Sequence, residues 1–159
     1  MSEPVFPGGL AGIAEQYDVF LSDVWGVIHN GRFAFDEACE ALVRFRDRGG
    51  AVCLITNAPV PKEQAIRYFD PLGVPADAYD DCVTSGDATR DVLKERVGDV
   101  FWRLGADAGW EYDKFLYEGL DLQFGDARSS DAVLCIGLED QLNDHPDDYR
   151  DRLAEAADR

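Results

Sequence analysis

Short apolar runs alternate with helix-forming segments along most of this chain, and this alternation is the feature that most limits its fold. Apolar runs at 19–21, 51–55 and 82–84 are each followed by a helical pattern or a loop that leads to one. Strands that alternate with helices are typical of βαβ units, in which parallel strands form one sheet and helices pack on it. The sequence therefore predicts an α/β fold built on a parallel sheet.

Glycine and proline residues set the expected bounds of the helices. The first helix is expected from Asp36 to Arg48, with Ala38, Leu42 and Phe45 on one face and the pair 49–50 as its stop. A second helix should begin at Pro61 and end at Pro71 and Gly73. Further elements are expected as a strand at 82–84, a helix at 87–97, strands at 100–104 and 132–136, and an amphipathic helix within 145–159.

Asp23 ends the first apolar run and precedes a loop that contains Gly26 and Gly31. The residues Val19 to Leu21 have the character of a buried parallel strand, and ligands of open α/β sheets bind outside the carboxyl ends of such strands. A carboxylate at position 23 is therefore in a reactive position. The alternative is that Asp23 only caps a turn.

Four segments carry a family resemblance in the expected order. They are YDVFLSDVWGVIHNG (17–31), GGAVCLITNAPVPKEQAIRYF (49–69), GVPADAYDDCVTSGDATRDVL (73–93) and AVLCIGLED (132–140). The first resembles motif I of the haloacid dehalogenase (HAD) superfamily, in its class IIA branch of NagD-like sugar phosphatases and nitrophenylphosphatases. The second resembles the motif II strand that ends in Thr56 and Asn57. The third and fourth are similar to a short strand ending in TS and to a VGxD strand inside the inserted cap domain.

The resemblance covers the chain from about Tyr17 onward and implies a fold. We expect a HAD-like Rossmannoid parallel sheet with helices on both faces, followed by the beginning of an inserted α/β cap domain. The implied core spans residues 1–98 and the partial cap 99–159. In the family, the chain continues and returns from the cap to the core. We therefore interpret this chain as an N-terminal portion of a class IIA protein, such as a truncated or split gene product.

The resemblance also implies a reaction. Asp23 would be the nucleophile that takes the phosphoryl group from a small phosphorylated metabolite, as in a phosphoric monoester hydrolase. Thr56 and Asn57 would bind the phosphate, and Mg²⁺ would be held by Asp23 and the backbone carbonyl of Trp25. On local sequence alone, Thr56 and Asn57 are equally well explained as helix caps, and Ser85 and Asp87 are assigned to capping of the next helix.

Trp25 departs from the family pattern, which has a second aspartate at this position as the general acid and base. An indole has one N–H donor and no carboxyl group, so it cannot replace that acid. Positioned acid–base groups contribute about 10²- to 10⁴-fold in rate, so hydrolysis should be slowed. His29 titrates in the useful range and is considered as a substitute acid. The other hypothesis is a noncatalytic HAD-like binding or interaction protein.

Asp140 and Asp144 have the DxxxD spacing of the family's magnesium motif, which leaves a further alternative open. The chain would then be a compact phosphatase without a cap, with Lys114 as the phosphate-binding lysine. Against this, Glu139 stands where the motif has glycine. The simpler interpretation is a polar loop before a helix that Asn143 or Asp144 caps.

Charge and composition exclude several partners. The formal net charge is −17, from 32 acidic and 15 basic residues among 159. Such a surface repels nucleic acid and anionic lipid, and no stretch approaches the roughly 18 apolar residues of a membrane helix. The four cysteines lack metal-binding spacing, and Cys53 and Cys135 are expected in the core. We expect a cytoplasmic protein that is open to homo-oligomer formation through an unpaired sheet edge.

Overall fold

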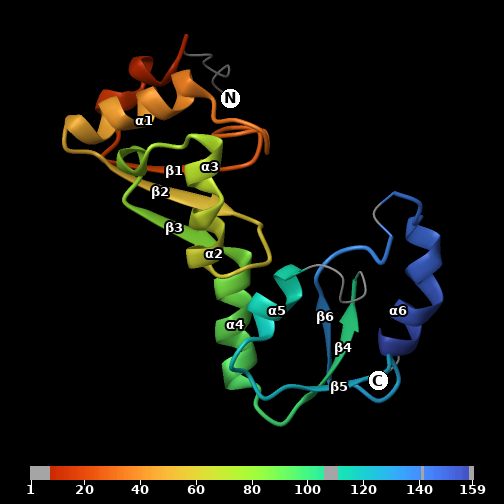
Figure 1. Ribbon diagram of the computed structural model, residues 1–159. Helices are drawn as coiled ribbons and strands as arrows, with labels where there is room; N and C mark the ends of the chain where they lie inside the picture. Colours follow the sequence, from red (N-terminus) through yellow and green to blue (C-terminus); the bar gives the residue numbers. More distant parts are fainter. Residues whose placement is uncertain (1–7, 106–110, 141, 158–159) are drawn as a thin grey trace, which may run out of the picture. The chain divides into compact units, whose positions relative to one another are not determined.

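The computed structural model of the protein describes residues 8–105, 111–140 and 142–157 (Figure 1). The chain divides into two compact units, residues 1–85 and 86–159, and each contains a three-stranded sheet. The sheet orders are β1-β2-β3 and β5-β4-β6, and all pairs are parallel. The predicted α/β fold with parallel sheets is thus confirmed.

Unit 1 contains three strands, three α-helices and three short 3-10 turns within its described residues. The strands are β1 (Val19–Asp23), β2 (Ala51–Thr56) and β3 (Asp81–Thr84), and the α-helices are α1 (Asp36–Asp47), α2 (Lys62–Arg67) and α3 (Phe69–Leu72). The 3-10 turns are η1 (Leu10–Gly12), η2 (Ala14–Gln16) and η3 (Ala76–Ala78). The observed β1, α1, β2 and β3 match the predicted elements to within a few residues.

The central strand β2 buries one of its faces and exposes the other. Val52 and Leu54 pack in a core with Leu42 and Phe45 of α1, and Leu54 is 0% exposed. Ile55 points to the opposite face and is 42% exposed. This alternation follows from the pleat, which sends successive side chains to opposite sides of a sheet. Helix α1 therefore covers one face of the sheet.

β1 differs from the buried strand that the sequence predicts. It lies at the edge of the sheet, and Val19 and Leu21 are exposed, Leu21 to 66%. Phe20 alternates with them, points to the covered face and packs edge-on against Phe45 with ring centroids 4.3 Å apart. The apolar run therefore reports a strand correctly, but only one of its faces is covered in this unit.

Two glycines end α1 for different reasons. Gly49 has a φ of 91°, a left-handed conformation that glycine adopts without steric cost, so it can follow the last helical turn. At Gly50, a Cβ atom would lie 2.2 Å from Cε1 of Phe45. The second glycine is thus needed because the Phe45 ring lies directly against the backbone there.

The helix predicted from Pro61 is broken into α2 and α3. The break falls at Tyr68, between the last residue of α2, Arg67, and the first of α3, Phe69. Pro71 explains it, because a proline ring lacks an N–H group and clashes with the carbonyl of the residue four positions earlier, which is Arg67 here. The left-handed Gly73 (φ 87°) then ends α3, as predicted.

Asp80 links the segment before β3 to α1 and β2. Its carboxylate accepts a hydrogen bond from the backbone N–H of Val52 at 2.7 Å and from the guanidinium of Arg46 at 2.5 Å. Arg46 also donates to the carbonyl of Asp77. Hydrogen bonding to Arg46 and then to Val52 lowers the pKa of Asp80 below its usual value.

Unit 2 has helices on both faces of its sheet. Leu93 of α4 packs with Phe101 on one side of β4, whereas Trp102 on the other side packs with Tyr149 and with Ala156 of α6. The elements are α4 (Ser85–Glu95), β4 (Val100–Leu104), α5 (Glu111–Tyr117), β5 (Gln123–Gly125), β6 (Ala132–Cys135), η4 (Pro146–Tyr149) and α6 (Arg150–Ala157). The sequence pattern predicts no element for the α5 and β5 segments. Cys135, expected in the core, is exposed.

Unit 2 begins at Gly86, the second residue of α4, whereas the predicted boundary lay after this helix, at 98/99. Arg90 of α4 donates hydrogen bonds to the carbonyls of Phe115, Leu116 and Glu118 at 2.8–3.0 Å. These are the free carbonyls at the C-terminal end of α5, which need such donors. The helix thus contacts unit 2 through both its apolar and its charged side chains. The assignment of the units to a core and a cap domain stays a prediction.

Leu54→Ala should destabilise unit 1 strongly, while Ile55→Ala should not. Truncation of a fully buried leucine typically costs about 2–5 kcal/mol, because it removes buried apolar surface and leaves a cavity. The neighbouring Ile55 is the matched control, since it has the same size and the same strand but faces solvent. Urea unfolding of both variants measures the difference. Equal losses of stability would contradict the observed division of β2 into two faces.

Asp80→Asn should lower stability at neutral pH and weaken its acid dependence. Because the pKa of Asp80 is lowered in the folded state, its contribution is present above the unfolded pKa of about 3.9 and is lost as the pH falls through the folded value. Thermal unfolding between pH 2 and pH 7 measures this contribution. The variant should lose less stability than the wild type over the acidic part of that range. Parallel curves for the two proteins would contradict the assignment.

Candidate functional site

The carboxyl edge of the unit 1 sheet brings two predicted site residues to adjacent strand ends. Asp23 is the last residue of β1 and pairs in register with Ile55, and Thr56 is the next residue and the last of β2. Adjacent strands lie about 4.8 Å apart, so the two strand ends are neighbours. The parallel register thus places a carboxylate and a hydroxyl group at one edge, as the sequence analysis predicted.

Asp23 is exposed and uses one of its carboxylate oxygens locally. Oδ1 accepts a hydrogen bond from the backbone N–H of Val24 at 2.7 Å. The other oxygen, Oδ2, accepts no hydrogen bond from any residue that the structure describes. The turn-capping interpretation and the reactive one are therefore compatible, because one oxygen orients the carboxylate while the other is available to a ligand.

The backbone of the loop after β1 leaves a second oxygen available. The carbonyl of Val24 accepts hydrogen bonds from the amides of Val27 and Ile28 at 3.2 and 2.8 Å. The carbonyl of Trp25, in contrast, accepts none from the described part of the chain. A free carboxylate oxygen and a free carbonyl oxygen thus lie two residues apart on one loop.

These two oxygens fit a magnesium site. Mg²⁺ prefers oxygen ligands, keeps several waters and is typically held by one or two carboxylates together with substrate phosphates. Among the described residues, no group of three or more His, Cys, Asp or Glu side chains is placed to hold a metal. The donors present therefore match a cation that shares its coordination with phosphate and water, and not a closed, all-protein site.

The Trp25 indole is exposed, but it packs against Gly31 and His29. It is 63% exposed, and its six-membered ring lies directly on Gly31, where a Cβ atom would be 2.4 Å from Cη2. The ring also meets the His29 imidazole edge-on, with centroids 5.6 Å apart and an interplanar angle of 83°. The position of the missing acid is thus occupied by an aromatic side chain whose orientation is fixed by packing.

His29 is buried in the loop, at 7% exposure. Its Nδ1 accepts the backbone N–H of Gly31 at 3.1 Å, so the neutral ring carries its proton on Nε2. Burial lowers the pKa of His29, which favours that neutral form. This geometry does not favour the alternative that His29 replaces the missing general acid, because the Nε2–H of a buried neutral imidazole is not acidic near neutral pH.

The loop after β2 is held by a residue whose role the sequence analysis missed. The Ser85 hydroxyl lies 2.8 Å from the carbonyl oxygen of Asn57 and 3.0 Å from that of Ala58, and donates its proton there. The sequence predicts Ser85 as a cap of α4, whereas in the structure its hydroxyl holds the loop after β2. Thr56 accepts the N–H of Ala58 through Oγ1 at 3.2 Å and donates its own proton to no described residue. The Thr56 hydroxyl therefore has the donor that a phosphate oxygen needs.

Asp140 and Asp144 form a closed turn in unit 2. Asp140 accepts hydrogen bonds from the amide of Leu142 at 3.0 Å and from Nδ2 of Asn143 at 2.7 Å. Asp144 accepts the N–H of Asp140 at 2.6 Å and the hydroxyl of Tyr149. Their oxygens are thus engaged within the loop, which does not favour the compact phosphatase alternative.

The cap of the following helix is His145, and not Asn143 or Asp144 as expected. Its Nδ1 accepts the N–H of Asp147, while the side chain of Asp148 accepts the N–H of His145 at 2.7 Å. The reciprocal pair is a capping box. Histidine is rarely read as a helix cap, so the sequence pattern pointed one or two residues too early.

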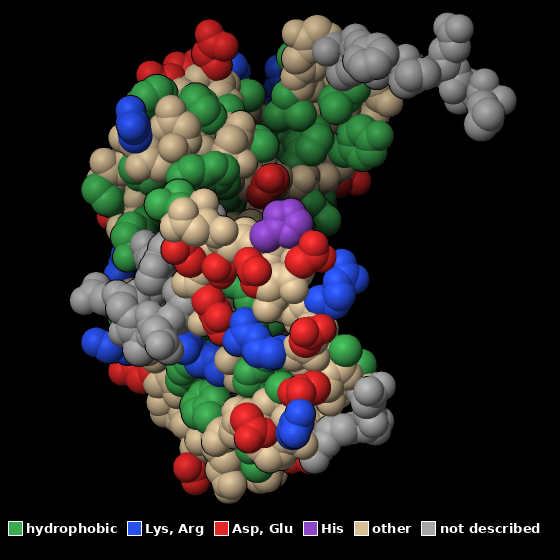
Figure 2. Space-filling view, turned by 90° about the vertical axis from the view of Figure 1, so that its right-hand side faces the viewer, with side chains coloured by type: hydrophobic (Ala, Val, Ile, Leu, Met, Phe, Trp, Pro, Cys, Tyr) green, Lys and Arg blue, Asp and Glu red, His purple; other side chains and the backbone are tan. Residues whose placement is uncertain are grey.

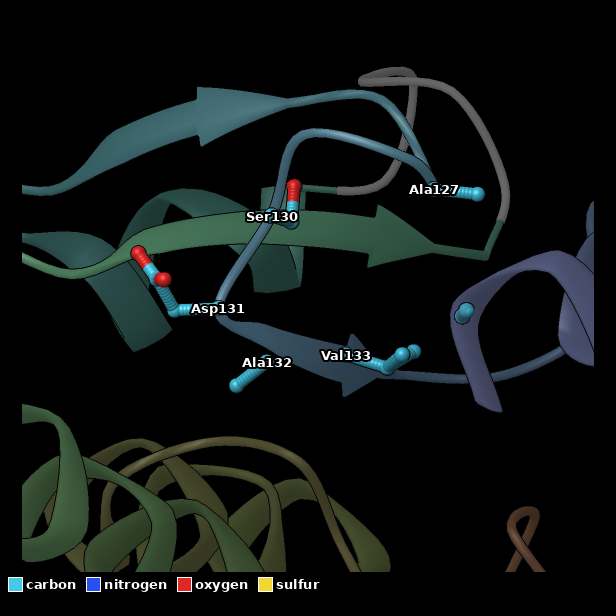
Figure 3. A pocket seen from close by; sticks show the side chains of 6 residues that line it. Ala127, Ser130, Asp131, Ala132 and Val133 are labelled. Carbon is cyan, nitrogen blue, oxygen red and sulfur yellow. The ribbon is translucent and has the colours of Figure 1, made fainter. Parts of the chain in front are cut away.

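A pocket in unit 2 contains none of the predicted site residues. It has a volume of about 320 Å³ and is lined by Ala127, Ser130, Asp131, Ala132, Val133 and Ala156 (Figure 3). The Ser130 hydroxyl donates to the carbonyl of Asp126 at 2.7 Å, and Asp131 accepts the N–H of Val100 at 2.9 Å. Its polar side chains thus hold the loop before β6, which explains their presence without a ligand.

The surface carries the acidic excess that the sequence predicts. Figure 2 shows Asp and Glu side chains spread over the visible face, among fewer Lys and Arg side chains. No helix in the described part of the chain is long and apolar enough to cross a membrane.

Gly31→Ala should displace the Trp25 indole, and Gly26→Ala should not. Both glycines have positive φ values, 82° and 78°, so both variants carry similar backbone strain. Only at Gly31 would the new Cβ overlap the indole, whereas nothing lies within 4 Å of a Cβ at Gly26. The indole N–H resonance of Trp25, assigned through Trp25→Phe, reports the displacement. Equal changes in the Trp25 indole N–H chemical shift in the two variants would contradict the packing of the indole on Gly31.

Comparisons with known proteins agree on one family. The sequence profile described as haloacid dehalogenase-like hydrolase matches residues 20–113, and no curated protein matches the chain. A haloacid dehalogenase-like hydrolase from Brucella suis is 37% identical with a TM-score of 0.81, and the match covers 97% of this chain and 57% of that one.

Two further solved structures have the same fold. A 4-nitrophenylphosphatase from Thermotoga maritima is 22% identical, with a TM-score of 0.57 and coverage of 91% of this chain and 51% of that one. NagD from Escherichia coli is 25% identical, with a TM-score of 0.51 and coverage of 88% and 51%. The chain thus spans about half the length of these relatives. It belongs to the haloacid dehalogenase-like hydrolases, in their class IIA branch.

Proposed function

We propose that this chain supplies the nucleophile and part of the phosphate and cation site of a HAD-type phosphatase that acts on a small phosphorylated metabolite. The observation that carries the proposal is the pair of free oxygens on the β1 loop, Asp23 Oδ2 and the Trp25 carbonyl, beside the Thr56 hydroxyl at the next strand end. A carboxylate, a carbonyl and a hydroxyl donor are the groups that phosphoryl transfer to aspartate requires.

The first step uses Asp23. Its free oxygen attacks phosphorus in line, an aspartyl phosphate forms, and the ester oxygen leaves with the bonding electron pair. Thr56 donates its hydroxyl to a phosphoryl oxygen, and Asn57 adds an amide donor from the loop that Ser85 ties in place. Asp23 and the Trp25 carbonyl would hold Mg²⁺, which would supply charge neutralisation for the phosphoryl oxygens.

The second step is hydrolysis of the aspartyl phosphate, and Trp25 makes it slow. Water adds to phosphorus, the bond to Asp23 breaks, and the water proton passes to solvent because no carboxylate stands at position 25. The leaving group of the first step must likewise take its proton from solvent. Good leaving groups such as nitrophenolate need no such proton, so the substrate range should favour them.

A second candidate function follows from the same residue. Trp25 leaves the cation-binding carbonyl intact but removes the acid, so the chain would bind a phosphorylated ligand without turnover. Such a protein would be a noncatalytic HAD-like binding or interaction protein. The two functions differ at Asp23, because a nucleophile is required for turnover, whereas removal of its negative charge should keep or tighten the binding of a phosphate anion.

The proposal includes a setting and a set of partners. The four cysteines are free thiols, which suits a reducing cytoplasmic compartment. The net charge of −17 favours a small ligand held with a cation over nucleic acid or a membrane surface. Self-association of the chain stays a prediction of the sequence.

Mg²⁺-dependent hydrolysis of 4-nitrophenyl phosphate should be lost in Asp23→Asn and should rise in Trp25→Asp. The restored acid should increase turnover of an alkyl phosphate by about 10²- to 10⁴-fold, and that of 4-nitrophenyl phosphate by less, because only the alkyl leaving group needs a proton. Steady-state assays with both substrates measure the two ratios.

Asp18→Asn is the control for this series, because it makes the same change at an exposed aspartate at the opposite end of β1. Turnover that survives Asp23→Asn would reject Asp23 as the nucleophile. If Trp25→Asp and the wild type are both inactive while Asp23→Asn binds inorganic phosphate at least as tightly as the wild type, the binding function is favoured instead.

A further inference from the structure

His29 makes three hydrogen bonds within the loop that follows Asp23, two through its backbone and one through its side chain. Its carbonyl accepts the N–H of Gly26 at 2.8 Å, and its own N–H reaches the carbonyl of Val24 at 3.4 Å. Its Nδ1 accepts the N–H of Gly31 at 3.1 Å. Residues on both sides of Trp25, and the end of the loop, are thus tied to this one residue.

The imidazole ring also joins the loop to the core. It lies between the Trp25 ring, at a centroid distance of 5.6 Å, and the Phe69 ring of α3, at 6.0 Å. Phe69 itself is buried in the unit 1 core. A small residue at position 29 would therefore remove the ring contact to Phe69 of α3, and an apolar residue of similar size would leave the Gly31 amide without its acceptor.

The hydrogen bonds account for the free Trp25 carbonyl. Gly26 N–H, on the other side of the Trp25 peptide unit, donates to His29 and thereby fixes the orientation of that unit. The Trp25 oxygen then faces away from the partners that Val24 uses, and no described residue donates to it. The orientation of the proposed cation ligand thus depends directly on the His29 backbone carbonyl, and the His29 side chain supports that carbonyl through its hydrogen bond to the amide of Gly31.

We propose that His29 is a positioning residue, whose Nδ1 acceptor holds the loop so that the Trp25 carbonyl stays available to a divalent cation beside Asp23. This inference rests on the proposed function, because it concerns the same Mg²⁺ site. It assigns the buried histidine to cation binding through the backbone, and not to proton transfer. Residues that orient metal ligands from behind typically change metal affinity by about 10- to 100-fold when they are removed.

One labelled pair of atoms tests this directly. Trp25–Gly26 is the only Trp–Gly pair in the sequence, so ¹³C-carbonyl tryptophan with ¹⁵N glycine gives a single carbonyl–amide NMR signal. The carbonyl shift reports cation binding at Trp25 when Mg²⁺ alone is titrated. The exchange rate of the Gly26 amide with solvent reports its hydrogen bond to the His29 backbone carbonyl.

Two variants separate the acceptor from the bulk of the ring. In His29→Asn, Oδ1 takes the place of Nδ1 and keeps the acceptor, so Gly26 protection and Mg²⁺ affinity should stay within a few-fold of the wild type. In His29→Leu the Nδ1 acceptor of Gly31 is lost while the backbone carbonyl at position 29 remains, so the segment 29–31 is no longer fixed; Mg²⁺ affinity should then fall about 10- to 100-fold, and Gly26, which donates to that carbonyl, should exchange faster. A role in packing alone predicts the reverse order, since leucine fills more of the buried space than asparagine.

The controls distinguish failure of this inference from failure of the proposed function. Asp23→Asn should lose the Mg²⁺ response while Gly26 stays protected. His145→Leu removes a similar Nδ1 acceptor in unit 2 and should change neither signal. If the wild type responds to Mg²⁺ and His29→Leu responds equally, His29 is not a positioning residue. If the wild type does not respond at all, the cation site itself is wrong, and the role assigned to His29 is wrong with it.

Discussion

The parallel pairing of β1 with β2 is the interaction on which the site depends. The register that aligns Asp23 with Ile55 brings the ends of both strands to one edge, and a shift by one residue would move every side chain of β1 to the opposite face. This register is held mainly by β2, since Val52 and Leu54 are buried against α1. The proposed nucleophile thus lies on the edge strand, while the burial that stabilises its position comes from the central strand.

The uncovered face of the unit 1 sheet has a consequence for Asp23. Val19, Leu21, Ile55 and Val83 form a row of exposed apolar side chains on this face, and Asp23 belongs to the same face by the alternation of β1. Open edges and apolar faces favour association with further protein. Any polypeptide that covers this face also reduces the access of water to Asp23, which would strengthen its electrostatic interactions and limit hydrolysis of an aspartyl phosphate.

The sequence predicted the strands and helices that have a periodic apolar pattern and the helix ends that glycine residues mark. The strand and helix periods located β1, α1, β2, β3 and β4, and the motif order led to the family. The β1 burial was wrong because a run of Val, Phe and Leu has no means of indicating how many of its faces are covered. The division of the Pro61 helix was missed because Pro71 acts at Arg67, four residues before itself.

Within the candidate site, the strand-end residues were predictable and the supporting contacts were not. Asp23 follows from its position at the end of an apolar run, and Thr56 follows from the motif resemblance at the end of the next run. The Ser85 hydroxyl and the His29 acceptor bind backbone groups 27–28 and 2 residues away, respectively. Such hydrogen bonds depend on how the loops close, and no periodicity reports loop closure. The sequence signal for the Ser85 contact was that two successive apolar runs end in similar polar pairs, Thr56-Asn57 and Thr84-Ser85.

Trp25 separates two properties that a single aspartate normally provides at this position. A carbonyl ligand belongs to the backbone, so its geometry depends on the hydrogen bonds of Gly26 and Gly31 and not on the side chain. Proton transfer belongs to the side chain and is lost with the carboxyl group. The indole nevertheless packs on Gly31 and against the buried His29. The same loop that keeps the Trp25 carbonyl free therefore also fixes an aromatic surface near Asp23.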